Sequence, residues 1–398
     1  MGGAKLRPLA WTKLRGAVVA QSLWADIKGG SSGVRVDPAD VIQEFSIDKP
    51  KPRGQAAAAA KKKKKQSQVQ HLLDSKRSTN LSIVLSRFKI PNRVIQLSIW
   101  CLDEAVLEEE DVAVLLTATP TQDEEALLKG HAGNGAGSSG LGRPEQYLIA
   151  VMAIPRLASR LVAWHYMITF PQKLTEIGQQ VDCLRDAIGT VMSSSALVTI
   201  LAQFLATGNF LNEGSFRGGA LGVKIGALTA ISDCKQTTRS RSAGKDSSRN
   251  LSHILAGALP KECAKLVEEF SIVSDARKVD YRNLSGAAEQ LAAGLGNVKE
   301  ELRATDGEDY ALSASALSSS LGKPDALPGK LKSFTRDAGE KLETILSSVG
   351  QCGDELLRLC CFFELPSPKV VQDCAPFAAE LLDSLDNFRG LLAAALKD

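Results

Sequence analysis

Apolar residues recur every three or four positions in the last third of the chain, the spacing of one helix face. The run lies between Pro328 and Pro366, residues that mark helix boundaries. Its heptad-like seam comprises Leu331, Phe334, Ala338, Leu342, Ile345, Val349, Cys352, Leu356 and Leu359. Glycines interrupt it at Gly339, Gly350 and Gly353. Because each glycine costs a helix about 1 kcal/mol relative to alanine, the pattern predicts a long helix with a partner, for which segment 261–303 is the candidate.

A second helical pattern opens the middle of the chain. Asp74 or Ser75 can cap its first helix. The apolar positions of that helix are Leu81, Val84, Leu85 and Phe88. Two more helices are predicted over 94–107 and 110–116, after a break at Pro91.

Helical periodicity resumes at residue 145 and continues with breaks to residue 210. A glycine-rich surface loop at 130–142 and a polar insertion at 239–249 interrupt the pattern. The uncharged stretch 192–211 is too polar to cross a bilayer and is expected to be a buried helix. No run alternates as a β-strand would, so the fold class is predicted to be all-α, in an elongated domain.

The N-terminal region has a different character. An apolar segment at 6–27 carries Trp11 and Trp24 and ends in a flexible glycine-serine joint at 29–33. The stretch beyond it includes five consecutive lysines at 61–65 and cannot build a core. The sequence therefore predicts a structured arm that a long basic linker tethers to the helical body.

The overall charge is close to balanced. The chain has 48 basic and 45 acidic side chains, a net charge of +3, which is too small to indicate nucleic acid as the main partner. The lysines at 61–65 could form a nuclear signal or a nucleic-acid patch, but no aromatic residue lies among them to stack on bases. A solvated linker is the favoured interpretation, and nucleic-acid binding remains a less favoured alternative.

Composition and motifs give no sign of catalysis. The eight cysteines and four histidines lack metal-site spacing or a disulfide framework, and the N-terminus lacks a signal-peptide core. Residues 135–140 fit the dinucleotide motif G-x-G-x-x-G, but a helical pattern precedes them instead of a strand. Residues 29–33 fit G-x-S-x-G but lie in the flexible joint. We therefore expect a cytoplasmic protein that is not an enzyme and has no metal, cofactor or membrane contact.

Short motifs follow one another in order along nearly the whole chain. They are R-P-L-A-W-T-K at 7–13, L-W at 23–24, L-D-S-K-R-S-T-N-L-S-I at 73–83, E-Q-Y at 145–147, I-P-R-L at 154–157, G-N-F-L-N-E-G at 208–214, D-C-K at 233–235 and D-N-F-R at 386–389. Each motif alone is weak. As an ordered set they resemble the formin homology 2 domain of the formins.

The resemblance implies a head-to-tail ring dimer, in which a lasso from one subunit wraps the post of the other. The interface residues it implies are Trp11, Trp24, Gly208, Asn209, Phe210, Asn212 and Gly214. A tryptophan on a tethered arm must find an apolar pocket, and the small residues around Gly208 and at 218–220 would leave room for one. The alternative is that both tryptophans pack on their own subunit.

The resemblance also implies two actin contacts. Ile83 resembles the knob isoleucine that formins insert at the filament barbed end, and Lys235 resembles the lysine of the lasso/post contact. Judged from the residues alone, Ile83 would be core and Lys235 a solvated charge. The implied regions are a lasso arm at 1–30, a flexible basic linker at 31–71, a knob at 72–170, helices leading to and forming the post at 171–280, and coiled-coil helices with a C-terminal return helix at 281–398.

The implied function is nucleation of unbranched actin filaments and processive capping of their barbed ends in the actin cytoskeleton. Departures from the family pattern are Thr79, Leu211, Cys234 and the insertions at 130–142 and 239–249. The insertions could block the actin-facing surface, so a dimeric helical scaffold without nucleating activity is the alternative function. Profilin is expected as a partner only if a proline-rich segment exists outside this chain, because its 15 prolines form no polyproline tract.

Overall fold

The computed structural model describes residues 72–133, 140–213, 219–233, 250–363 and 371–397. The chain divides into two compact units, Met1–Gln66 and Ser67–Asp398, and the described residues belong to the second. Helices dominate these ranges, which contain no β-strand. The predicted all-α class is therefore confirmed, whereas the predicted lasso arm and linker lie outside the described residues.

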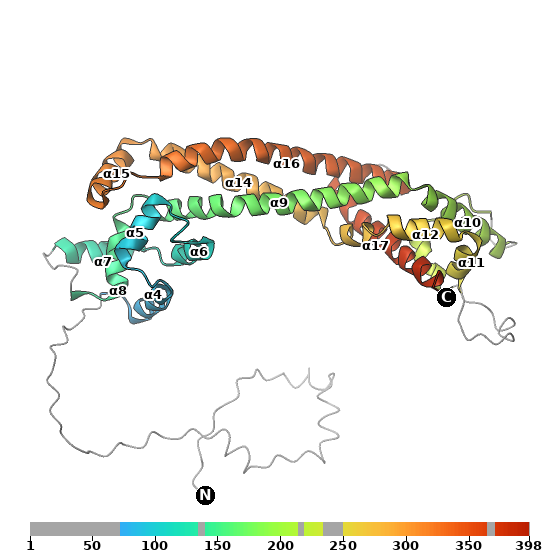
Figure 1. Cartoon of the computed structure of the whole chain (residues 1–398), viewed down its shortest axis with the longest axis horizontal. Helices are drawn as coiled ribbons and strands as arrows, with labels where there is room; N and C mark the ends of the chain where they lie inside the picture. The colour runs from blue at the N-terminus through green and yellow to red at the C-terminus, as the bar shows by residue number, and fades with distance from the viewer. Residues whose placement is uncertain (1–71, 134–139, 214–218, 234–249, 364–370, 398) are drawn as a thin grey trace, which may run out of the picture. The chain divides into compact units, whose positions relative to one another are not determined.

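The elements are α4 (Ser75–Arg87), α5 (Asn92–Cys101), α6 (Glu109–Thr117), α7 (Gln122–Gly133), α8 (Arg143–Met152), α9 (Leu157–Ser193), α10 (Ser195–Leu211), the 3-10 helix η3 (Ile225–Asp233), α11 (Leu251–Ala258), α12 (Pro260–Glu269), α13 (Val273–Ala276), α14 (Tyr281–Thr305), α15 (Glu308–Leu321), α16 (Leu327–Phe363) and α17 (Val371–Ala395). Three of them, α9, α14 and α16, pack side by side along much of their length (Figure 1). Helix α16 is the long helix that the heptad-like seam predicts, and Pro328 lies in its first turn, where proline is tolerated.

The partner predicted for this long helix is only partly correct. Segment 261–303 breaks into α12, α13 and most of α14, with a turn at 270–272 and an N-cap at Asp280, which accepts a hydrogen bond from the Arg282 amide. Helix α14 packs against α16 and α9, whereas α12 packs against α10 and α17. The first part of the segment therefore supports different helices from those predicted.

Two apolar cores fill the described unit. The first core consists of buried side chains from α4 to α8, the first turns of α9, Val298 of α14, α15 and the start of α16, and its largest members are Trp100, Tyr147 and Trp164. The second core consists of buried side chains from the rest of α9, α10 to α14 and the rest of α16 and α17.

Three aromatic rings join the cores. Tyr166 and Phe334 pack against both of them, and Phe170 belongs to the second core. The ring centroids lie 5.3 Å apart for Phe170 and Phe334, 5.7 Å for Tyr166 and Phe170, and 6.0 Å for Tyr166 and Phe334. Tilted and edge-on aromatic pairs at such distances are favourable, so α9 and α16 are tied together where the two cores meet.

Three local predictions need correction. The helix predicted over 94–107 ends at Cys101, because Leu102 adopts a left-handed conformation with φ 49°. The glycine-rich loop predicted at 130–142 is shorter, because α7 continues to Gly133. The stretch 192–211 is not a uniformly buried helix, because Ser194 caps a new helix and the end of that helix is exposed.

Candidate functional site

Helix α4 presents one large apolar side chain to solvent. Asp74 caps its start by accepting from the amides of Lys76 at 3.0 Å and Arg77 at 3.4 Å. Leu81 and Leu85 are buried, and the helix packs on α8. Ile83 lies between these positions and is 65% exposed. Its side chain therefore lies outside the core, although its helical spacing alone would suggest burial.

An arginine at each end fixes α4. At the start, Arg77 Nε donates to Glu124 Oε1 at 2.8 Å, and its Nη2 donates to the Thr119 carbonyl at 2.8 Å. At the end, Arg143 Nη2 donates to the carbonyls of Phe88 at 2.8 Å and Ile90 at 3.1 Å. These bonds reach residues 40 or more positions away in the sequence, so they orient α4 against the rest of the first core.

The carboxylate that receives Arg77 is itself held in place. Glu124 Oε2 accepts from the Thr121 amide at 2.9 Å, at the start of α7. Partial burial would raise the pKa of Glu124, but the hydrogen bonds from Arg77 and Thr121 outweigh it and hold the pKa below its usual value. The charged carboxylate is thus the form that the folded state favours.

The second candidate surface is the end of α10. The Asn209 side chain pairs with the Ala220 backbone in both directions: its Nδ2 donates to the carbonyl and its Oδ1 accepts from the amide, each at 2.8 Å. Gly219 precedes this pair with φ +71°, a conformation that suits glycine. A Cβ added to Gly208 would meet no atom within 4 Å, so open space borders this glycine.

This end of α10 displays apolar side chains. Phe210 is 76% exposed and Leu211 is 56% exposed, and Leu221, next to the paired Ala220, is 100% exposed. Because Asn209 ties Ala220 to α10, these side chains belong to the same end of the described unit. Exposed apolar groups gathered in one place are typical of an interaction surface.

The structure brings together only some of the predicted site residues. It places Gly208, Asn209, Phe210 and Asn212 at the end of α10, beside the second core, and Ile83 on α4, beside the first core. Four predicted residues, Trp11, Trp24, Gly214 and Lys235, lie outside the described residues.

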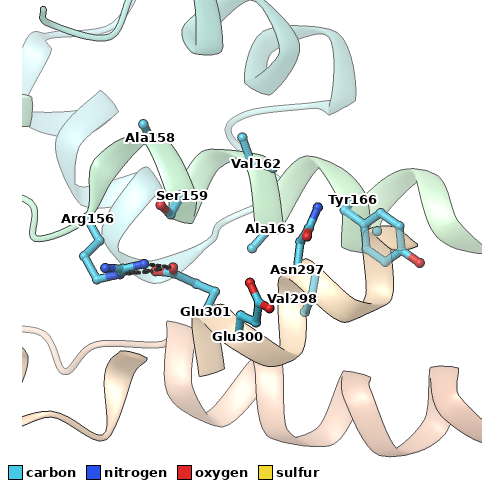
Figure 2. A pocket seen from close by; sticks show the side chains of 11 residues that line it. Arg156, Ala158, Ser159, Val162, Ala163, Tyr166, Asn297, Val298, Glu300 and Glu301 are labelled. Atoms are coloured by element: carbon cyan, nitrogen blue, oxygen red, sulfur yellow. Dashed lines mark hydrogen bonds and ion pairs between the residues drawn. The ribbon is translucent and has the colours of Figure 1, made fainter. Parts of the chain in front are cut away.

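One hollow of the described residues lies beside the start of α9. Figure 2 shows a hollow of about 410 Å³ between α9 and α14. Arg156 closes one end of it through a bidentate pair with Glu301, at 2.9 Å from Nε to Oε1 and 2.5 Å from Nη2 to Oε2. No histidine or cysteine lines this hollow. Across the described part of the chain, no three His, Cys, Asp or Glu side chains gather in a group that could hold a metal ion.

Membrane-spanning character is likewise not found in single helices. Within the described ranges, no single helix is both long and apolar enough to cross a bilayer. Only α8 and α9 taken together are long and apolar enough, and this pair is bent by 86°.

The comparison with known families identifies the chain. The model of the Formin Homology 2 Domain matches residues 3–389. The chain belongs to the formin homology 2 family. The resemblance carried by the ordered motifs is therefore confirmed over nearly the full sequence, including segments that the structure does not describe.

Formin relatives share moderate identity with this chain. It is 30% identical to formin-like protein 18 of Arabidopsis thaliana over 315 residues, 77% of this chain and 26% of the relative. It is 28% identical to formin-like protein 3 of Oryza sativa subsp. japonica over 357 residues, 87% of this chain and 28% of the relative. The chain thus spans about a quarter of the length of these relatives.

Sequence reasoning missed two features of this formin homology 2 chain. Arg77 stands inside the motif at 73–83, but its partner Glu124 is 47 positions away, so only the fold shows the pair. Asn209 was predicted as an interface residue, and its amide groups pair with Ala220. Gly219 next to Ala220 was a usable signal, because its φ of +71° is a conformation that favours glycine.

Proposed function

We propose that this formin homology 2 chain assembles actin filaments as a homodimer: it nucleates unbranched filaments and stays bound at their barbed ends as they grow. The observation that carries the proposal is the exposure of Ile83 on a helix fixed at both ends. No bond of the chain or of actin has to be made or broken by this protein, so binding energy alone accounts for the activity.

Ile83 suits a contact with an apolar pocket on actin. An isoleucine that is buried at an interface gains roughly 1.5–3 kcal/mol from the hydrophobic effect. A rigid helix loses little further conformational entropy when it binds. Lys235 is the proposed second contact, where a lysine would meet an acidic actin surface.

The end of α10 suits the dimer contact. Phe210, Leu211 and Leu221 present an apolar surface, and open space borders Gly208. In the proposed dimer, Trp11 and Trp24 of the lasso arm cover this surface on the other subunit. Buried aromatic anchors often dominate the binding energy of an interface.

The proposed regions keep the boundaries given by the sequence. They are the lasso at 1–30, the linker at 31–71, the knob at 72–170, the post region at 171–280 and the coiled-coil and return helices at 281–398. A long linker would let the two halves of the dimer step in turn, so that one actin contact persists while the other is released.

A pyrene-actin assay with the purified chain tests the proposal. The chain should shorten the lag of assembly and slow growth from the barbed ends of preformed seeds. Ile83→Ala should abolish both effects and change the free energy of unfolding by less than about 0.5 kcal/mol, as surface truncations do. The matched control is Leu312→Ala on α15, where the leucine is 72% exposed, and it should keep full activity.

Two outcomes would contradict the proposal. A folded dimer of the unaltered chain that leaves actin assembly unchanged would support the scaffold function instead. An Ile83→Ala dimer with full activity would show that actin is bound through another surface.

A further inference from the structure

We infer that Arg77 is a positioning residue for the actin contact: it sets the angle at which α4 presents Ile83. This inference rests on the proposed function. It begins from the contacts of one partly buried guanidinium that links three elements of the first core.

Arg77 uses all its nitrogen atoms. Its Nε donates to Glu124 Oε1 at 2.8 Å and its Nη2 donates to Glu124 Oε2 at 3.3 Å, so the pair with α7 is bidentate. Its Nη2 also donates to the Thr119 carbonyl at 2.8 Å, and its Nη1 donates to the Thr117 carbonyl at 3.3 Å. One side chain therefore connects the first turn of α4 with the last residue of α6 and the first turn of α7.

The apolar contacts of α4 restrain its rotation about its own axis less than they restrain its distance from α8. The helix rests on α8 through Leu81 and Leu85. Apolar packing is not directional, so this stripe sets the separation of the helices more strongly than the rotation of α4. The planar guanidinium of Arg77, with fixed donor directions, restrains the start of α4, as Arg143 and Arg87 restrain its end.

Arg77 acts on Ile83 at a distance. The two residues are six positions apart, which places them about 120° apart around the helix and about 9 Å apart along its axis. A partner that covers Ile83 would approach another face of α4 than the one Arg77 uses. An effect of Arg77 on actin affinity would therefore pass through the orientation of the helix.

The experiment measures barbed-end affinity and thermal stability for the full chain. Arg77→Lys keeps the charge but lacks the fork, and it should weaken barbed-end affinity roughly five- to tenfold, the net effect of about one ordinary hydrogen bond. The matched control is Arg185→Lys, because Arg185 forms a bidentate pair with Glu355 between α9 and α16. This control should lower Tm about as much as Arg77→Lys and leave the affinity unchanged.

A double-mutant cycle separates positioning from a merely structural role. Ile83→Val should weaken binding measurably without abolishing it. If Arg77 acts through Ile83, the combined Arg77→Lys and Ile83→Val variant should lose less affinity than the product of the two single losses. Glu124→Gln should reproduce part of the Arg77→Lys effect on affinity.

The possible failures are distinguishable. Full affinity of Arg77→Lys, together with loss of binding by Ile83→Ala, would overturn this inference and leave the proposed function intact. The inference would also be overturned if the affinity loss of the double variant equalled the product of the two single losses. Full barbed-end binding by Ile83→Ala would overturn the proposed actin site itself, and the inference with it.

Discussion

The first core and the second core differ in the polar groups that they bury. Among the described residues, the buried charged side chains are Glu145, Arg160 and Glu301; the first two lie on α8 and the start of α9 in the first core, and Glu301 lies on α14, three positions after Val298 of the first core. The buried polar residues beside the second core carry no charge and include Thr169, Ser194, Ser252 and Ser384. Fully buried charge therefore belongs to the end of the described unit that holds the first core, whereas the ion pairs on second-core elements, such as Arg185 with Glu355 and Arg389 with Asp386, are partly exposed.

This difference matches the surfaces that the cores carry. The first core supports α4, whose exposed Ile83 is the proposed actin contact. The second core supports the end of α10, where Phe210, Leu211 and Leu221 form a broader apolar surface. A broad apolar contact tolerates small changes in orientation better than a single side chain does.

The largest expected effect comes from Arg160, at the centre of the first core. Its fully buried guanidinium donates to Asp325 at 2.9 Å, to the Trp100 carbonyl at 3.2 Å and to the Tyr310 hydroxyl at 2.8 Å. Arg160→Met leaves Asp325 without its cation and should lower the free energy of unfolding by about 3–5 kcal/mol. Urea denaturation measures the loss.

The control for this test lies at the surface. Arg185→Met breaks a partly exposed pair with Glu355 and should cost no more than about 1 kcal/mol. Equal losses for the two variants would mean that the ionic network does not distinguish the first core.

The next effect concerns the apolar surface of the second core. Phe210→Ser combined with Leu221→Ser should convert the dimer to monomers, because each buried apolar side chain contributes roughly 1.5–3 kcal/mol to association. Multi-angle light scattering measures the mass. Trp11→Ala with Trp24→Ala should have the same result, since it removes the other side of the proposed contact.

Leu312→Ser provides the matched control, because Leu312 is an exposed leucine on α15, an element of the first core. It should leave the dimer intact. Dimers that survive the Phe210 and Leu221 changes would place the subunit contact elsewhere. The proposed dimer role of this apolar surface would then be wrong.

The smallest expected effect is a dependence of stability on pH, caused by one partly buried carboxylate beside each core. Interactions hold the pKa of Glu124 in the first core and of Asp386 in the second below their usual values, although partial burial opposes both shifts. Hydrogen bonds from Ser274 and Arg389 are the main lowering cause for Asp386. A lowered carboxylate pKa stabilises the fold above the unfolded-state value of about 4, and this stability is lost as the pH falls through the folded-state value.

Glu124→Gln and Asp386→Asn should therefore each lower stability by about 1–2 kcal/mol at pH 7, and the difference from the unaltered chain should shrink at pH 3. Thermal unfolding at both pH values measures it. Glu125→Gln removes only an exposed pair with Lys129 and should change stability by less than about 0.5 kcal/mol. A loss that stays equal at both pH values would point to packing instead of charge.

The sequence by itself determined the fold class and the family. The three- and four-residue spacing of apolar positions predicts α16 nearly in full, and Asp74 predicts the start of α4, because periodicity and caps are local properties. The ordered motifs alone identify the formin homology 2 domain. The same local rules failed for segment 261–303, because a helix can break at a turn without changing the apolar spacing around it.

Only the tertiary structure decided which side chains face solvent and which distant groups meet. Ile83 and Leu81 are both apolar residues of α4, yet one is exposed and the other buried, since burial depends on where α8 lies. Arg77 meets Glu124 across 47 positions, and Arg160 meets Asp325 across 165. Such pairs need the chain to fold back on itself, and spacing along a single helix contains no information about that return path.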